Sequence, residues 1–302
     1  MSRLRQSKQI RLYRYETLQG YLFISPWLLG LLLFTVAPML ASLYLAFTNY
    51  NILTAPQWAG LDNFRQMFTG DERYWKSWRA TLVFVFGAVP LRLLFALATA
   101  MLLNQKIKLL GLFRTAYYLP TLLGGSVAVA VIWRQLFGSS GALNSLLESL
   151  FGINSDISWI THPATVMYSL IGLSVWQFGS AMIIFLAGLK QIPQSLYEAA
   201  AIDGAGLRHR LFNITLPLLT PVLLFNLIMG IINGFKVFTE GLIITGGGPF
   251  DKTLFYVLYL YEQSFRYYNM GYGSAMAWML LVVIGLCTGV LFATSRKWVF
   301  YE

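Results

Sequence analysis

The sequence contains little charge for its length. Charged residues make up 11% of the 302 residues, whereas about 25% is usual for a soluble domain. A soluble fold of this size would lack the polar surface that it needs, so a typical soluble enzyme is excluded. A disordered chain is excluded as well, because 57% of the residues are hydrophobic. The composition therefore indicates a protein that crosses a membrane several times.

Cysteine and histidine are also scarce. Cys287 is the single cysteine, so neither an internal disulfide nor a metal site of paired cysteines can form. His162 and His209 are far apart in the sequence, which argues against a histidine-rich metal site. A membrane-embedded enzyme would need His, Asp or Glu clustered at one depth, and the predicted spans contain no such cluster. We therefore expect no metal and no catalytic residue in this chain.

Six stretches are long and apolar enough to cross the hydrocarbon core. They are Tyr21–Phe47, Thr81–Leu103, Tyr117–Phe137, Val166–Leu186, Leu216–Phe238 and Tyr272–Ala293. The first is too long for the core of a cleaved signal peptide, so we expect it to remain as a span. Pro26 and Pro38 should bend it or mark its ends. The predicted fold class is an all-α integral membrane protein with six transmembrane helices.

The net charge is +10, which in a soluble protein would favour binding to nucleic acid. Here Lys and Arg are concentrated in the segments on the side of the N-terminus, and most acidic residues fall on the opposite side. The positive-inside rule therefore places both termini in the cytoplasm, and we expect no nucleic-acid partner. The predicted organisation is a cytoplasmic tail at residues 1–20, a membrane domain at 21–295 and a second cytoplasmic tail at 296–302.

The inner loop between the fourth and fifth spans, residues 189–217, has the pattern of two helices joined by a glycine turn. Helix-forming residues follow Pro193, Gly204 and Gly206 interrupt them, and Leu207–Ile214 can form a second short helix. A smooth alanine surface next to a glycine turn suits docking to a soluble partner. From the residues alone, a helix that lies on the membrane surface is an equally good interpretation.

The residues of this loop carry a specific resemblance. Glu198-Ala199-Ala200 is followed by Gly204 and, nine residues later, by Ile214-x-Leu216-Pro217. This spacing resembles the EAA signature in the permease subunits of binding-protein-dependent ATP-binding-cassette (ABC) importers. Further stretches resemble the carbohydrate-uptake branch of that family, which contains the maltose and glycerol-3-phosphate permeases. They are Gly60–Phe64, Tyr118–Pro120, Gly246–Pro249 and Lys297–Val299.

The resemblance implies the fold of a type I ABC importer permease, the MetI-like fold, and a division of labour. In the family, the loop forms coupling helices seated in a groove of an ATPase, whose closure switches the spans between inward-open and outward-open states. The residues implied in that contact are Glu198, Ala199, Ala200, Asp203, Gly204 and Gly206. The sequence contains no G-x-x-x-x-G-K-[ST] phosphate loop. We therefore expect ATP and Mg on the partner ATPase subunits and no cofactor in this chain.

The resemblance also implies a set of partners in a bacterial inner membrane. These are a second, related permease subunit, two ATPase subunits, an extracytoplasmic solute-binding protein, membrane lipid, and a sugar or oligosaccharide substrate. The solute-binding protein is expected to dock near Gly246–Phe250 and Asn51–Trp78. An ion-coupled secondary transporter of a small polar solute is the alternative. It would need acidic residues at mid-membrane, and we find none there in the predicted spans.

Polar residues within the spans are candidates for the substrate path. The candidates are Trp176, Gln177 and Ser180 in the fourth span and Asn226, Asn233 and Lys236 in the fifth. Trp176 is suited to stack on a sugar ring. Polar residues also mediate helix packing in membranes, so each candidate has this second interpretation. We expect Lys236 near the outer surface, where it would snorkel or pair with Glu240 one helical turn further on.

Arg92 is the unusual charge of the second span, two residues after Pro90. Pro90 frees the carbonyl of Phe86, so nearby backbone is expected to help satisfy the guanidinium. No acidic residue of the predicted spans lies at its depth. Arg92 therefore has either a structural role or a place in a central cavity. In the second case it would meet an acid of a partner subunit or an acidic substrate such as a uronate or a phosphate.

Overall fold

The computed structural model describes residues 19–105, 108–153 and 156–300, and these residues are mostly helical. Apart from the first helix, the α-helices are α2 (Ala37–Ala46), α3 (Asp62–Thr69), α4 (Glu72–Leu103), α5 (Leu110–Leu123), α6 (Val127–Leu136), α7 (Ala142–Phe151), α8 (Val166–Trp176), α9 (Gly179–Gln191), α10 (Gln194–Ile202), α11 (Leu207–Arg210), α12 (Leu216–Phe235), α13 (Tyr256–Tyr261) and α14 (Met270–Ser295). A short antiparallel hairpin joins β1 (Thr48–Asn49) to β2 (Gln57–Trp58). The all-α prediction is confirmed. The predicted tail at 1–20 lies outside the described residues except for its last two.

Four helices are long and apolar enough to cross a membrane: Gln19–Ala46, Glu72–Leu103, Leu207–Thr245 and Met270–Ser295. Two bent pairs supply two further spans if each pair is counted as one, with bends of 99° between α5 and α6 and 43° between α8 and α9. The predicted third span, Tyr117–Phe137, is therefore broken into two helices. Gly124 and Gly125 interrupt it, and the Ser126 hydroxyl caps the new helix by accepting the N–H of Val129 at 3.3 Å.

Several helix boundaries also differ from the predicted ones. Helix α4 begins at Glu72 rather than near Thr81, because the Asp71 side chain caps it by accepting the Tyr74 N–H at 3.1 Å. The second helix of the inner loop is not separate. It continues through a π-helical segment, Leu211–Thr215, into α12. Pro217 is accommodated there because the π-helical segment directly before it alters the backbone hydrogen-bond pattern at the donor that proline lacks.

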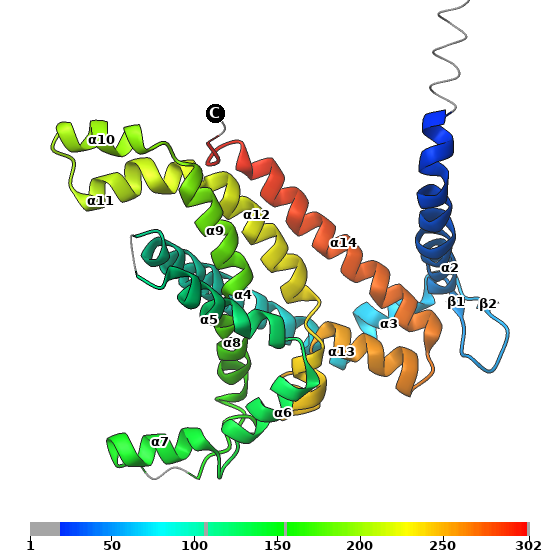
Figure 1. The fold of residues 1–302 in the computed structure, drawn as a ribbon. Helices are drawn as coiled ribbons and strands as arrows, with labels where there is room; N and C mark the ends of the chain where they lie inside the picture. Colours follow the sequence, from blue (N-terminus) through cyan, green and yellow to red (C-terminus); the bar gives the residue numbers. More distant parts are fainter. Residues whose placement is uncertain (1–18, 106–107, 154–155, 301–302) are drawn as a thin grey trace, which may run out of the picture.

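We expected Pro26 and Pro38 to bend the first helix or to mark its ends, and the second alternative is wrong because the helix passes through both prolines. A π-helical segment, Leu32–Val36, lies just before Pro38 and accommodates the backbone donor that proline lacks. In Figure 1 this helix stands apart from the other spans, and its last part, α2, contacts α14. Trp278 of α14 donates its indole N–H to the Ser42 hydroxyl at 3.1 Å.

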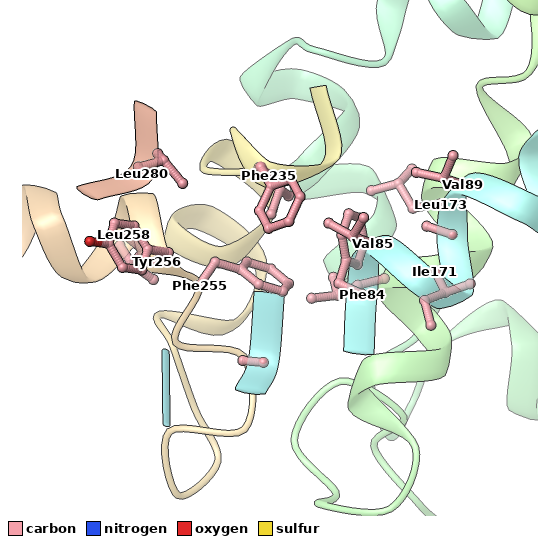
Figure 2. Packing of buried hydrophobic residues seen from close by; sticks show 14 of the residues in the cluster. Phe84, Val85, Val89, Ile171, Leu173, Phe235, Phe255, Tyr256, Leu258 and Leu280 are labelled. Atoms are coloured by element: carbon pink, nitrogen blue, oxygen red, sulfur yellow. The ribbon is translucent and has the colours of Figure 1, made fainter. Parts of the chain in front are cut away.

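Helix α4 forms the centre of the remaining bundle and packs against α8, α9, α12 and α13. Figure 2 shows buried side chains of α4, including Phe84 and Val85, facing α8 on one side and the segment around Phe255 on the other. Helix α12 comes close to α4 because glycine faces valine at their contact. A Cβ atom on Gly230 would lie 2.9 Å from Val89 Cγ1. Small residues allow this kind of backbone approach in membrane helices.

The molecule has two distinct ends (Figure 1). One end carries α10, α11 and the C-terminal residues, and we call it the loop end. The backbone N–H of Phe300 donates to the Thr220 hydroxyl at 2.9 Å and holds the C-terminal residues against α12 there. The opposite end carries the β1–β2 hairpin, α7 and α13, and we call it the hairpin end. The first helix begins toward the loop end, so both ends of the described chain lie on the side of the α10–α11 loop.

Candidate functional site: a central cavity and an exposed two-helix loop

An open cavity of about 490 Å³ lies among α4, α8, α9 and α12 and the segment that follows α12. Its volume falls within the range of small-molecule sites. Phe225 and Phe238 contribute apolar walls. The polar and charged side chains that line it are Arg92, Ser174, Gln177, Ser180, Asn226, Asn233, Lys236, Thr239 and Glu240. Apolar walls with a few polar groups are typical of a binding pocket.

Six of the seven predicted path residues line this cavity, and Trp176 does not. Trp176 is 39% exposed, and its ring lies 5.9 Å from that of Trp133, centroid to centroid, in α6. The cavity lining therefore does not support the predicted stacking of Trp176 on a sugar ring. Sequence reasoning missed Ser174 and Thr239. Ser174 could have been found, because it lies in the predicted fourth span three residues before Gln177. Contact between any of these side chains and a substrate stays a prediction.

Arg92 has a buried nitrogen that lacks a hydrogen-bond partner. Its Nε is buried and has no hydrogen-bond partner, and no other hydrogen bond or ion pair of Arg92 is found in the described part of the chain. The expectation that backbone freed by Pro90 would help satisfy the guanidinium is therefore wrong. Helix α4 continues through Pro90 to Leu103, so the helical backbone around the proline stays largely internally bonded.

Glu240 corrects a second expectation about Arg92. The sequence predicted no acid near this arginine, yet Glu240 lines the same cavity and interacts electrostatically with Arg92. Helix α12 ends at Phe235, and after a short break the π-helical segment Glu240–Thr245 follows within the same long helical span. Glu240 is the first residue of that segment and lines the cavity together with Arg92 of α4.

Lys236 follows α12 directly and lines the cavity with an exposed side chain. Because the helix is interrupted at this residue, the predicted helical pairing with Glu240 does not form. No ion pair joins the two side chains among the residues that the structure describes. The cavity thus holds two cationic groups and one acidic group without a direct ion pair between them.

Two amides of the cavity also form hydrogen bonds within the protein, one between helices and one within a helix. The Gln177 side chain donates to the Gly124 carbonyl at 3.3 Å, and the Gln177 carbonyl accepts from the Thr121 hydroxyl at 3.1 Å, which links α8 to α5. Asn226 is 4% exposed and donates to the Val222 carbonyl at 3.1 Å within α12. For these two residues the packing role and the pocket role coexist. The side chains of Ser180 and Asn233 form no hydrogen bond within the described residues, so their polar atoms are free for a ligand.

The inner loop forms the second part of the site, at the loop end. Helix α10 buries none of its residues, and Glu198, Ala199 and Asp203 are exposed. Gly204 has φ +75°, a left-handed conformation that glycine adopts without strain. The Ala205 N–H donates to the Ala200 carbonyl at 2.8 Å and closes the turn. The predicted pattern of a helix, a glycine turn and a helix is confirmed for this loop.

The tip of the loop is apolar as well as exposed. Ile202 and Leu207 flank the turn and are 87% and 85% exposed. Sequence reasoning did not single them out, although both lie within the signature. Adjacent exposed apolar side chains mark interaction surfaces. Arg210 donates its Nε–H to the Ala205 carbonyl at 2.8 Å and so stabilises the turn.

A charged and hydrogen-bonded cluster holds the hairpin end together. Arg73 lies 3.1 Å from Asp251 and 3.3 Å from Glu262, and Arg266 lies 2.7 Å from Glu262. Tyr259 donates its hydroxyl to Asp71 at 2.8 Å, and burial, together with this neighbouring carboxylate, raises the pKa of the Tyr259 phenol. These contacts fix α13 and the preceding loop to the start of α4.

The apolar helices, the central polar cavity and the exposed loop define a polytopic membrane protein of the transporter class. Residues 81–300 match the family model of the binding-protein-dependent transport system inner membrane component. The chain belongs to this family. Its members are transport components, and the resemblance to carbohydrate-uptake permeases is confirmed by the relatives that follow.

The chain is 54% identical to the probable ABC transporter permease protein YesP of Bacillus subtilis, over 98% of this chain and 96% of that protein. It is 31% identical to the lactose transport system permease protein LacF of Rhizobium radiobacter, over 95% and 97% of the two chains. In structure it is similar to a chain of a bacterial ABC transporter involved in the import of the acidic polysaccharide alginate. That match has a TM-score of 0.81 and 21% identity and covers 95% of this chain and 99% of the other. It supports the predicted type I importer permease fold.

Proposed function

We propose that this chain is a transmembrane subunit of an ATP-driven, binding-protein-dependent importer of sugars or oligosaccharides. The observation that carries the proposal is the exposed α10–α11 loop, with Glu198 and Ala199 on its surface and Gly204 in the left-handed conformation. Its substrate class is supported by relatives whose names describe sugar transport, LacF among them. The chain itself performs no bond chemistry in this proposal, and ATP and Mg are bound by the partner ATPases.

The loop acts as the contact through which a partner ATPase drives the spans. Its helix α10 stands outside the bundle, whereas α11 continues into α12, which lines the cavity. A force applied at the loop tip therefore reaches the cavity through one continuous helical segment. Glu198 is placed to pair with a basic group of the ATPase, and Gly204 permits close approach of its backbone.

The remaining partners follow from the same proposal. A second, related permease completes the pathway, because the cavity of this subunit is open rather than enclosed. Two ATPases bind at the loop end. A solute-binding protein docks at the hairpin end, where Leu53 and Phe250 are 87% and 85% exposed. A neighbour in structure was determined with an alginate pentasaccharide-bound periplasmic protein, which supports a partner of this kind.

The proposed location is the bacterial inner membrane, with both termini and the α10–α11 loop in the cytoplasm. The excess of Lys and Arg in the segments on that side supports this orientation. So does the position of the C-terminal residues, which pack against α12 near the loop. The domain limits at 20 and 296 remain predictions.

The decisive experiment is purification of the tagged chain from its source organism. We expect an ATPase and a second permease to co-purify, and we expect uptake in vesicles to require ATP. Glu198→Arg and Gly204→Trp should abolish uptake and release the ATPase. Glu148→Arg makes the same charge change on exposed α7 at the hairpin end and should retain the ATPase. Purification without an ATPase, with uptake driven by an ion gradient, would establish the ion-coupled alternative.

A further inference from the structure

We propose that the central cavity binds an anionic saccharide, a sugar whose carboxylate groups face Arg92 and Lys236. This inference rests on the proposed function, because it names the class of sugar that the importer carries. The cavity contains two cationic side chains and a single acidic one, Glu240, among the described residues that line it. A ligand with a negative charge would balance the excess cation, and a neutral sugar would not.

Arg92 is the strongest part of this argument. Its guanidinium lines the cavity, its Nε is buried without a hydrogen-bond partner, and Glu240 attracts it without forming an ion pair. Arg92 as a whole is half-buried, and a partly desolvated charge without hydrogen bonds retains a strong tendency to bind an acceptor. A carboxylate accepts two parallel hydrogen bonds from a guanidinium, which matches the donors that Arg92 leaves unused.

The neutral part of the lining suits the rest of a sugar. Ser180 and Asn233 carry polar groups without partners in the described residues, and these are donors and acceptors for hydroxyls. Phe225 and Phe238 offer apolar surface to the less polar face of a sugar ring. Lys236 follows the end of α12 on the same wall as Asn233, so the hydroxyl-binding groups and a second cation lie close together. The cavity thus combines both kinds of recognition.

The test uses the complete transporter, purified with its partner subunits and reconstituted in vesicles. One probe is a pool of short uronate oligosaccharides from partial hydrolysis of galacturonan, glucuronan and alginate. The control probe is the same pool after carbodiimide activation and borohydride reduction, which converts each carboxylate to a primary alcohol and preserves linkage and size. We expect ATP-dependent uptake from the untreated pool and at least tenfold less from the reduced pool.

Variants assign the preference to the cavity rather than to the solute-binding protein, which is a separate chain. Arg92→Gln should reduce uptake of the uronate pool by about 10- to 100-fold, the range expected for a lost hydrogen bond to a charged group. Arg92→Lys should retain more uptake because it keeps the charge. Arg79→Gln removes the same charge from an exposed position of α4 outside the cavity and should behave like the unaltered protein. Lys236→Gln provides a second test if Arg92→Gln does not assemble.

The possible outcomes separate this inference from the proposed function. Equal uptake of both pools, or less than a twofold effect of Arg92→Gln and Lys236→Gln, would overturn the anionic ligand and leave the importer intact. Dissociation of the two permeases in Arg92→Gln, without a preference for the uronate pool, would assign Arg92 to an acid of the second permease and overturn the inference. Uptake of neither pool would overturn it too, while co-purification of the ATPase decides the proposed function independently.

Discussion

The hydroxyl of Tyr197 lies 2.9 Å from Oγ1 of Thr215, and this hydrogen bond joins α10 to the helical segment that continues into the cavity wall. The Thr215 hydroxyl also donates to the Arg210 carbonyl at 3.3 Å, so Tyr197 acts as the donor between the two hydroxyls. The two helices of the loop are therefore tied together near their base as well as through the Gly204 turn. A push on α10 reaches α12 by two routes.

We expect Tyr197→Phe to weaken coupling without releasing the ATPase. The lost hydrogen bond contributes about 0.5–1.5 kcal/mol, so sugar uptake per ATP hydrolysed should fall about 2- to 10-fold. The measurement is parallel uptake and ATP hydrolysis in vesicles. Tyr261→Phe is the matched control, because the described residues offer its hydroxyl no hydrogen bond and its ring packs against Phe238. An unchanged ratio in Tyr197→Phe would show that the turn alone transmits the motion.

The conformation of Gly204 leads to a second prediction. A Cβ atom at this position would meet no atom within 4 Å, so the effect of a substitution comes from the backbone alone. At φ +75° an alanine is disfavoured by about 1–2 kcal/mol. Gly204→Ala should therefore reduce uptake and weaken retention of the ATPase during purification. Gly204→Asn should recover part of both, because asparagine tolerates the left-handed region.

Gly206 provides the comparison for that experiment. It has φ −71°, which any residue adopts, and its surroundings are equally open. Gly206→Ala should cause a smaller loss than Gly204→Ala. If the two alanine variants lose uptake to the same extent, the left-handed turn is not what the loop requires, and the smooth surface of both glycines matters instead.

How much of this structure can be predicted from the sequence depends on whether a feature is set by neighbouring residues or by contacts between distant parts of the chain. Hydropathy located the spans because burial in lipid depends on composition over a whole window. It missed the 99° bend between α5 and α6, since two glycines and a serine hardly change the mean of an apolar stretch. The local signal was nevertheless present in Gly124, Gly125 and Ser126, which form the break and the new cap.

The cavity shows which features local patterns in the sequence cannot predict. Helical spacing placed Asn226, Asn233 and Lys236 on one face, and the structure places all three at the cavity. The same spacing gave the wrong relationship between Lys236 and Glu240, because the helix ends at Phe235. The shared position of Glu240 and Arg92 at the cavity depends on how α12 packs against α4 and the following segment against α6. No local pattern in the sequence carries this information.

Glu262 is predicted to stabilise the hairpin end. Its side chain is 5% exposed and lies 3.3 Å from Arg73 and 2.7 Å from Arg266. Glu262→Gln removes the charge while keeping the shape, so we expect it to lower the free energy of unfolding by about 1–3 kcal/mol. Thermal unfolding of the purified protein in detergent, followed by tryptophan fluorescence, measures the change.

The exposed pair of Lys76 and Glu72 serves as the control for Glu262. Their side chains are 45% and 83% exposed at a distance of 2.9 Å, so the pair is screened by water. Glu72→Gln should cost less than about 1 kcal/mol. Equal destabilisation by the two substitutions would mean that burial of Glu262 does not strengthen its ion pairs.

The orientation in the membrane is testable because Cys287 is the single native thiol. In a Cys287→Ser background, Leu207→Cys places a thiol at the loop end and Leu53→Cys places one at the hairpin end, at positions 85% and 87% exposed. Vesicles washed with urea to remove peripheral subunits are treated with a membrane-impermeant maleimide. We expect Leu53→Cys to react in right-side-out vesicles and Leu207→Cys in inverted ones. The reverse pattern would place the α10–α11 loop outside the cell, where no ATP-hydrolysing partner can reach it, and coupling through Glu198 and Gly204 would then be impossible.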